Sequence, residues 1–312
     1  MPNADVSIYA NRGAQLMASN GIRIREDVLY TDEKGEESER RRKRGEKALE
    51  KLKEVLPAIL EGDETVLYVV SQCKAPADIL EQLTMGWYIQ VITATTLVFT
   101  NRRILHFGVT TKGKWKKTLK SVRWRGIAEA TVKGWISRQM ILKYANGKKD
   151  VYWGLNGKDG KKVKAIFEAM MPASRGEAGA EPGMTSLCPE CRAALSAGKY
   201  SCGQCGLGFK DEKTLAWRTI LIPGGAYFYT RVWFLGIASG FADGMFSLVF
   251  LYSALAAMNP GILEPGKDGT RPAAEGLWVV AGFFLFIVCL HKLIAYRHGR
   301  RAVRTYLPLD RS

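Results

Sequence analysis

The stretch TATTLVFTNRRILHFGVT, residues 93–110, holds two runs of β-branched and aromatic residues that meet at Asn101 and Arg102. Residues of these types favour β-strands, and a polar pair between two such runs favours a turn. The stretch therefore predicts a hairpin of two strands joined by a tight turn at Asn101-Arg102.

Further short strands are predicted on both sides of this hairpin. TVLYVVSQC (residues 65–73) has the composition of a buried strand, and four more runs follow between residues 117 and 155. Asn146-Gly147 indicates a second hairpin, because both residues tolerate positive φ. Many short strands and one closing helix predict a small β-barrel plugged by that helix. The helix is expected from Gly157, and its apolar face is formed by Val163, Ile166, Phe167 and Met170.

Two motifs in this region resemble those of bacterial pleckstrin-homology-like domains. They are E-x-V-L-Y (residues 64–68) and L-x-x-T-N-R-R-I (residues 97–104), and the similarity extends over residues 61–172. The resemblance implies a fold used for binding or assembly, without a shared catalytic residue and without a fixed lipid ligand. Residues 74–89 are longer than a minimal member requires, which predicts an inserted helix or loop.

The N-terminal residues precede this domain. Residues 1–44 are polar and lack a hydrophobic period before about Glu36, so we expect a mobile or loosely attached arm. Residues 45–60 predict an amphipathic helix that either docks on the next domain or forms a short coiled coil, with Pro57 ending or kinking it. Its apolar stripe consists of Leu49, Leu52, Leu56 and Ile59.

Lysine and arginine give the chain a formal net charge of +16, which favours an anionic partner such as a lipid surface or a nucleic acid. The run RRRKR (residues 40–44) is typical of a solvated face, with a phosphate or lipid-headgroup contact as the alternative. A second basic group lies on the predicted strands. Its candidate contacts with anionic lipid are Arg102, Arg103, Lys114, Lys116, Lys117 and Arg123.

Residues 173–186 are rich in Pro, Gly, Ala and Ser and predict a linker. Residues 187–210 follow, and they hold four of the six cysteines in the spacing C-x2-C-x10-C-x2-C. Two C-x-x-C pairs can supply four thiolates to one tetrahedral ion, and the segment resembles the short zinc ribbons of bacterial membrane proteins. Pro189, Gly203 and Gly206 suit the tight turns that such pairs need. The predicted ligands are Cys188, Cys191, Cys202 and Cys205.

A structural Zn²⁺ ion is the favoured interpretation of this cluster, because four thiolates leave no open coordination position for catalysis. An iron site of the rubredoxin type has the same ligands but usually a larger surrounding fold. A redox dithiol needs only one C-x-x-C, at a helix start in a thioredoxin-like context that the sequence lacks. The predicted ribbon is too short to bury a core unaided, so the metal would supply most of its folding free energy.

Two apolar segments near the C-terminus are long enough to cross a bilayer, which takes about 20 residues. The first segment, residues 219–258, contains the interfacial or re-entrant turn LIPGGAYFYTR and a span from residue 232; the second span is residues 277–296. The turn resembles the P-G-x-G-x-F-Y element that precedes the first span of TM2-like proteins, with Ala226 in place of its second glycine. The aromatic belt at the interface would then contain Tyr227, Tyr229 and Trp233.

Basic residues lie on the outer sides of both spans, whereas the loop between the spans has only Lys267 and Arg271. The positive-inside rule therefore places both termini in the cytoplasm, with residues 297–312 as a basic tail. The bacterial resemblances imply the inner membrane. Cysteines in that compartment stay reduced and free to bind metal.

Two features lie inside the first span. Gly236, Gly240 and Gly244 form a flat stripe that lets another helix approach closely, either the second span or another subunit. Asp243 lies beside the stripe and must face protein or water. It is either a packing or interface group or part of a proton or ion path. Two helices cannot enclose a pore, so transport would require an oligomer.

Together these features predict a multidomain α+β chain: a pleckstrin-homology-like small β-barrel with a C-terminal helix, a zinc ribbon and a two-helix transmembrane hairpin. No phosphate loop, nucleophile elbow or catalytic carboxylate pair occurs in the sequence, so no enzyme is predicted. We expect a membrane-anchored binding or scaffold protein, with membrane lipids and a protein partner or further copies of itself as partners. The alternatives are a channel or transport subunit that uses Asp243 and, less favoured, a nucleic-acid binder that uses Trp115, Trp124 and Trp135.

Overall fold

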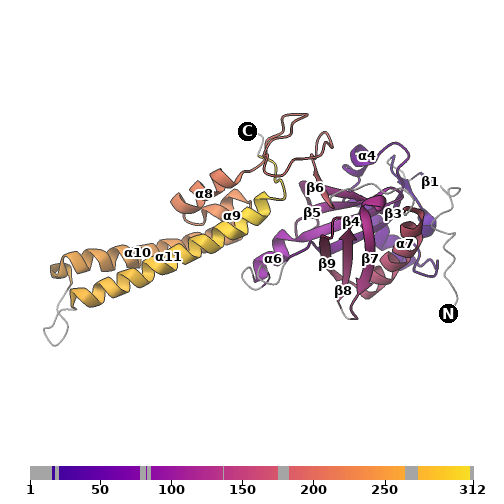
Figure 1. The fold of residues 1–312 in the computed structure, drawn as a ribbon. Helices are drawn as coiled ribbons and strands as arrows, with labels where there is room; N and C mark the ends of the chain where they lie inside the picture. The colour runs from indigo at the N-terminus through magenta and orange to yellow at the C-terminus, as the bar shows by residue number, and fades with distance from the viewer. Residues whose placement is uncertain are drawn as a thin grey trace. The chain divides into compact units, whose positions relative to one another are not determined.

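The structure, a computed structural model, describes residues 16–17, 21–77, 82, 86–135, 137–174, 183–263 and 273–309. The chain divides into two compact units, unit 1 (Met1–Gly208) and unit 2 (Phe209–Ser312) (Figure 1). The first 15 residues of the predicted arm, residues 78–81 and 83–85 of the predicted insertion at residues 74–89, and the loop residues 264–272 lie outside the described residues.

Unit 1 is built on one large sheet whose strands are antiparallel, except that β2 runs parallel to β3. The path of the sheet is, in spatial order, β10 (Thr185–Leu187), β6 (Trp115–Arg123), β5 (Arg103–Val109), β4 (Ala94–Thr100), β3 (Val66–Lys74), β9 (Lys149–Leu155), β8 (Arg138–Tyr144) and β7 (Ile127–Lys133). Off this path, β1 (Leu16–Met17) pairs with β2 (Arg23–Ile24), and β2 pairs with β3.

The hairpin predicted at Asn101-Arg102 is confirmed as β4 and β5, with Leu97 opposite His106 and Phe99 opposite Ile104. All seven residues of each strand are buried. A strand is buried at every position only where both faces of its sheet are covered. The hairpin therefore lies between two cores, and each core has a different cover.

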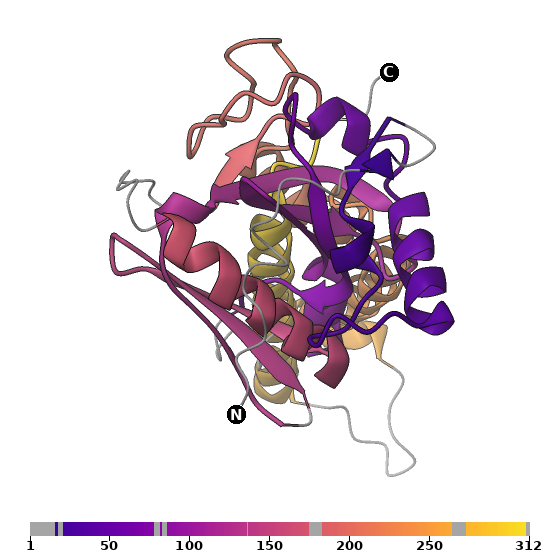
Figure 2. The same cartoon turned by 90° about the vertical axis from the view of Figure 1, so that its right-hand side faces the viewer.

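The first core fills the space between strands β3–β6, strands β7–β9 and the helix α7 (Gly157–Ser174) (Figure 2). The helix begins at Gly157 as predicted, and it buries Val163, Ile166 and Phe167. The Phe167 ring contacts both Phe99 and Trp124, the latter in the 3-10 turn η1 (Trp124–Gly126). The last strand of this core thus leads directly into the helix that covers it.

The second core lies on the other face of β3–β6 and is covered by the N-terminal residues. Ile22 and Ile24 are 2% and 1% exposed, and α2 (Glu26–Leu29) adds Leu29. Ile24 pairs with Val66 at the start of β3. Residues 21–44 thus differ from the loosely attached arm that the sequence predicts. A few scattered apolar side chains are enough to hold this segment, because they pack on an apolar face of the sheet.

The predicted helix at residues 45–60 is broken into two. Helix α3 (Glu39–Glu50) starts one residue before the basic run and ends well before Pro57, and α4 (Leu56–Ile59) carries that proline in its first turn, where no backbone N–H is needed. The apolar stripe docks on the sheet rather than forming a coiled coil. Its buried members are Leu49, Leu52, Leu56 and Ile59.

The predicted linker, residues 173–186, is shorter than expected at both ends. Helix α7 continues to Ser174, and Thr185–Leu187 form β10, which pairs with β6 so that Leu187 lies opposite Leu119. Residues 175–182 lie outside the described residues. The cysteine segment therefore starts from the edge of the sheet.

A buried ion pair fixes the turn of the β4–β5 hairpin. Glu64, whose side chain is fully buried, accepts hydrogen bonds from the Arg103 guanidinium at both oxygens, over 3.0 and 2.9 Å. Thr100 Oγ1 donates to Glu64 over 2.7 Å and accepts from the backbone N–H of Arg102 over 3.2 Å. Arg103 also donates to the carbonyl of Ile59 over 3.0 Å. The pair thus joins the hairpin to α4 and to the start of β3.

We expect Glu64→Gln to lower the free energy of unfolding of unit 1 by about 3 kcal/mol, because it leaves the Arg103 charge buried without its main counter-charge. Glu61 pairs with Arg103 over 3.0 Å and is 35% exposed, so it limits the loss. Urea unfolding of the detergent-solubilised chain measures the change. The matched control is Glu129→Gln, whose pair with Lys143 is half-exposed on both sides, so that solvent screens it and its loss should change the stability little. Equal losses in both variants would contradict the assignment.

Unit 2 contains two long apolar helices that run side by side (Figure 1). They are α10 (Trp233–Met258) and α11 (Ala274–Val303), and both are long and apolar enough to cross a membrane, in agreement with the two predicted spans. Large apolar side chains point outward from them; Phe241 is 75% and Val279 is 73% exposed. The shorter elements are α8 (Glu212–Leu221), α9 (Gly225–Tyr229) and the 3-10 turn η2 (Pro260–Ile262).

The end of the chain is more ordered than the basic tail that the sequence predicts at residues 297–312. Helix α11 runs to Val303, and Arg300 and Arg304 each donate to Glu212 of α8 over 2.8 Å. The next residues return to the start of the unit, where the Lys210 N–H donates to the carbonyl of Leu307 over 2.8 Å. The arginines of the tail thus serve to hold α8 against α11.

Candidate metal centre and intramembrane polar cluster

The four clustered cysteines of unit 1 bring their sulfur atoms together. The Sγ atoms of Cys188 and Cys205 are 3.6 Å apart, those of Cys191 and Cys202 are 3.4 Å apart, and all four lie within 4.8 Å of one another. Four sulfurs at about 2.3 Å from a tetrahedral ion lie about 3.8 Å from each other. All four cysteines are free of disulfides, so the cluster could hold one metal ion.

Both C-x-x-C pairs are held by turns of the same construction. The Cys188 N–H donates to the carbonyl of Ala193, and the Cys202 N–H donates to the carbonyl of Leu207, each over 2.8 Å. In each pair the backbone N–H of the first cysteine thus bonds the carbonyl of the residue five positions later, and this hydrogen bond closes a turn around both cysteines. The two halves of the site are therefore equivalent in backbone geometry, as expected when two loops each supply two ligands to one ion.

The residue after the second cysteine of each pair adopts positive φ. Gly206 has φ +73 and Arg192 has φ +66, whereas Gly203, which the sequence also suggested for a turn, is not in the left-handed region. A residue with a side chain in this region costs about 1–2 kcal/mol. Arg192 thus stores strain that the sequence did not reveal, and ligand binding by the four sulfurs would compensate for it.

The turns also tune the thiols. Backbone N–H groups of Cys205 and Gln204 lower the pKa of Cys202 to about 6, whereas burial raises the pKa of Cys188. The thiolate is the form that binds a metal ion. Four sulfur donors suit Zn²⁺ or iron, and around one ion they leave no coordination position for a substrate.

We expect the chain purified from cells to carry one equivalent of metal at the cluster. Cys191→Ser removes one of the four ligands and should lower the metal content toward zero, because a three-thiolate site loses both affinity and the closure of its loop. Metal analysis by mass spectrometry measures the ratio. The control is Cys289→Ser, which changes an exposed cysteine of α11 and should leave the ratio unchanged. A full metal load in Cys191→Ser would refute the assignment.

In unit 2, Asp243 is the centre of a polar cluster. Its carboxylate, 4% exposed, accepts hydrogen bonds from His291 Nδ1 over 2.6 Å, from Lys292 Nζ over 2.9 Å and from the backbone N–H of Gly224 over 3.0 Å. The sequence analysis singled out Asp243 without naming its partners. Lys292 also donates to the carbonyl of Ile222 over 3.3 Å. The sequence feature that could have indicated this pairing is the adjacent pair His291 and Lys292 within an otherwise apolar segment.

Two glycines of the stripe, Gly236 and Gly240, pack against the turn that precedes α10. Gly224 has φ +67, and a Cβ placed there would lie 2.0 Å from the carbonyl oxygen of Gly236. A Cβ at Gly236 would lie 2.5 Å from the Phe228 ring, and one at Gly240 would lie 3.2 Å from the carbonyl oxygen of Pro223. The sequence predicts that another helix, either the second span or one of another subunit, packs on the glycine stripe. At Gly236 and Gly240 the turn that precedes α10 packs there instead.

The aromatic residues of this turn also lie elsewhere than predicted. Tyr227 and Tyr229 are 6% and 5% exposed, so they do not contribute to an interfacial belt. The Tyr227 hydroxyl hydrogen-bonds His298 Nδ1 over 2.7 Å, and the Tyr229 hydroxyl accepts from the Asp211 N–H over 3.0 Å. Trp233 is 65% exposed, as a belt residue requires.

Asp243→Asn should destabilise unit 2 by roughly 3–5 kcal/mol, because it leaves the Lys292 ammonium without its counter-charge in a largely buried position. The double variant Asp243→Asn/Lys292→Gln should lose less than the single variant, since it removes both charges. Thermal unfolding of the full chain in detergent gives both values. The single variant Lys292→Gln completes the cycle, and a double variant that loses the sum of the two single losses would show that the pair contributes no coupling.

The glycine stripe offers a matched pair of substitutions. Gly236→Ala should destabilise unit 2 by about 1–3 kcal/mol, because the methyl group has to displace the Phe228 ring. Gly244→Ala should have little effect or stabilise α10 slightly, because a Cβ at Gly244 meets no atom within 4 Å. Thermal unfolding of the two variants compares them. A larger loss for Gly244→Ala would instead indicate that another subunit packs on the stripe.

The basic residues predicted to contact lipid do not form one exposed surface. Arg103 is buried with Glu64. Lys116 donates to the carbonyl of Val91 over 2.8 Å, at the end of α6 (Trp87–Ile92), and burial lowers its pKa to about 8. Both residues thus serve the fold of unit 1 rather than its surface.

The other four predicted lipid contacts are divided. Arg102 pairs with Asp63, and Arg123 lies 3.7 Å from Glu61. Lys114 and Lys117 are exposed on the β6 side of the sheet. Two exposed lysines remain from the six residues, which is a weak basis for electrostatic attraction to a bilayer.

The three tryptophans named for nucleic-acid binding differ in exposure. Trp124 is buried in the first core, where it donates to the carbonyl of Thr100 over 2.9 Å. Trp115 packs on Phe107. Trp135 is 89% exposed. A stacking platform for bases needs several exposed rings in one groove, and the buried Trp124 cannot contribute to one.

Comparisons with protein-family models, with curated proteins and with solved structures found no match to this chain.

Proposed function

We propose that this chain is a membrane-anchored binding or scaffold protein, in which unit 1 binds a partner and unit 2 holds it at the bilayer. The observation that carries this proposal is the contrast between the two units. Unit 1 encloses two cores of its own, whereas the long helices of unit 2 turn large apolar side chains outward along their length. An apolar surface of this extent is stable in a bilayer and costly in water.

Helix α8 supports the anchoring role. It buries Leu215 and Thr219 and exposes Trp217, Ile220 and Leu221 at 57%, 64% and 70%. A short helix with one buried side and one exposed apolar side fits the interface between headgroups and acyl chains. We assign α8 to that position, with the cytoplasmic side given by the basic residues that flank the two spans.

The finer assignment of unit 1 follows from sequence motifs together with the geometry. We propose that the curved sheet closed by α7 is a pleckstrin-homology-like barrel, and that residues 187–210 are a zinc ribbon whose ion is structural. The support is the strand order, the single closing helix and the two equivalent cysteine turns. In this proposal Zn²⁺ stabilises the short segment that directly precedes the anchor in sequence, and it takes no part in chemistry.

A channel or transport subunit remains the second candidate, and Asp243 is the residue it would use. The carboxylate already accepts hydrogen bonds from three donors of its own unit. A group that is satisfied in this way stabilises packing, whereas an ion path needs a carboxylate that water or an ion can reach. The cluster therefore favours the anchoring role over transport.

Native mass spectrometry of the full chain, extracted in mild detergent from its own cells, tests the proposal. We expect one metal ion per chain and a partner protein or a further copy of the chain in stoichiometric amount. The comparison variant is Lys114→Ala/Lys117→Ala, which removes the two exposed lysines of the predicted basic surface. A chain that carries neither a partner nor a further copy, and that conducts ions in reconstituted vesicles, would overturn the scaffold in favour of the transport subunit.

A further inference from the structure

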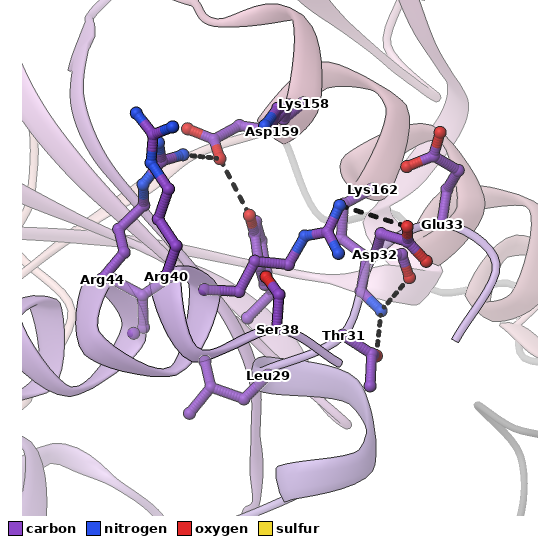
Figure 3. Close-up of a pocket in the computed structure, with 14 residues that line it drawn as sticks. Leu29, Thr31, Asp32, Glu33, Ser38, Arg40, Arg44, Lys158, Asp159 and Lys162 are labelled. Carbon is purple, nitrogen blue, oxygen red and sulfur yellow. Dashed lines mark hydrogen bonds and ion pairs between the residues drawn. The ribbon is translucent and has the colours of Figure 1, made fainter. Parts of the chain in front are cut away.

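A recess with a cavity volume of about 70 Å³, partly open to solvent, lies in unit 1 between the first turns of α3 and α7. Figure 3 shows Arg40 and Arg44 of α3 on the same side of the recess as Lys158 and Asp159 at the start of α7. Five cationic and three carboxylate side chains line it, and its apolar part is formed by Leu29, Val69 and Tyr68. The sequence suggested a phosphate contact at residues 40–44 only as an alternative, and the recess itself was not predictable because its two walls are more than a hundred residues apart in the chain.

The carboxylates of the recess are already engaged. Asp32 pairs with Arg41 over 3.1 Å and accepts backbone N–H groups of its own turn. Glu33 pairs with Lys161 over 3.2 Å. Asp159 accepts from the Tyr68 hydroxyl over 2.8 Å. These acids therefore have little capacity left to neutralise the remaining cations.

Three cations at one end of the recess are left with little or no compensation. The side chains of Arg40 and Lys158 make no hydrogen bond or ion pair with any residue that the structure describes, and both residues are exposed. Arg44 reaches Asp159 only over 3.4 Å and is 48% exposed. Ser38 is the N-cap of α3, and its hydroxyl makes no capping hydrogen bond. A concentration of positive charge at the mouth of a cavity attracts an anion.

The deeper part of the recess adds a buried cation. Lys162 is 2% exposed, and its ammonium donates to Thr31 Oγ1 over 3.0 Å and to the carbonyl of Asp32 over 2.9 Å. Burial lowers the pKa of Lys162 to about 8. A nearby anion would offset that cost. The first turns of α3 and α7 add the positive ends of two helices, of 12 and 18 residues.

We propose that this recess binds the phosphate group of a small phosphorylated ligand, with Arg40, Arg44 and Lys158 as its charged contacts. A phosphate offers several acceptor oxygens and up to two negative charges, which suits two arginine forks, an ammonium and a hydroxyl better than a carboxylate does. The apolar part of the recess takes the carbon skeleton of the ligand. This inference does not depend on the metal ion or on the anchor.

Isothermal titration calorimetry with the full chain in phosphatidylcholine nanodiscs tests the proposal, with glycerol 3-phosphate and inorganic pyrophosphate as probes. Arg40→Ala/Lys158→Ala should weaken binding at least about tenfold, because it removes two charge-assisted contacts. Both side chains are exposed, so the fold should persist, and circular dichroism checks this. The matched control is Lys47→Ala/Lys148→Ala, which removes the same charge outside the recess and should bind like the wild type.

A second set of nanodiscs containing phosphatidic acid distinguishes the source of the phosphate. If these discs abolish the heat of glycerol 3-phosphate binding in the wild type, the site stands and its phosphate comes from a lipid headgroup; if they do not, the ligand is soluble. The proposal is overturned if the wild type binds neither probe. It is equally overturned if Arg40→Ala/Lys158→Ala binds as tightly as the wild type, or if both double variants weaken equally, since that result indicates only non-specific attraction.

Discussion

The fold of unit 1 depends on one buried carboxylate, that of Glu64, because it joins three segments through side chains that are almost fully buried. It accepts both arms of the Arg103 guanidinium and the Thr100 hydroxyl, and Arg103 in turn holds the carbonyl of Ile59. A charge with no exposed surface is tolerated only when it is paired and fully hydrogen-bonded. The tight turn of the hairpin, the entry to β3 and the end of α4 therefore have to form together.

The parts of the fold that the sequence predicted are those decided by local pattern. The β4–β5 hairpin, the start of α7 and the two long apolar helices each follow from residues within one window of the chain. The cysteine cluster is of the same kind, because the spacing of two C-x-x-C pairs already restricts where the sulfurs can go. Such features need little information about the rest of the chain.

The parts that could not be predicted depend on segments that meet only in three dimensions. Ile22 and Ile24 look like isolated apolar residues in a polar arm, and their role becomes visible only when β3–β6 present a second apolar face. The same holds for Gly224, whose backbone fits on Gly236 only because neither residue has a side chain there. Arg103 was wrongly predicted to lie on the surface, because a charged residue in a basic stretch is usually exposed. The structure shows that it is buried and paired with Glu64.

Each unit contains a buried carboxylate that accepts hydrogen bonds from several segments, at a point where apolar packing alone does not determine the backbone conformation. In unit 1 Glu64 gathers donors from a hairpin and its neighbour, and in unit 2 Asp243 gathers donors from α11 and from the turn at Gly224. The thiols of the cysteine cluster are placed to do the same with a metal ion. Each centre is strongly stabilising only when all its partners are present, because any partner left alone keeps the full cost of its burial. A small segment that contains such a centre thereby acquires one well-defined conformation.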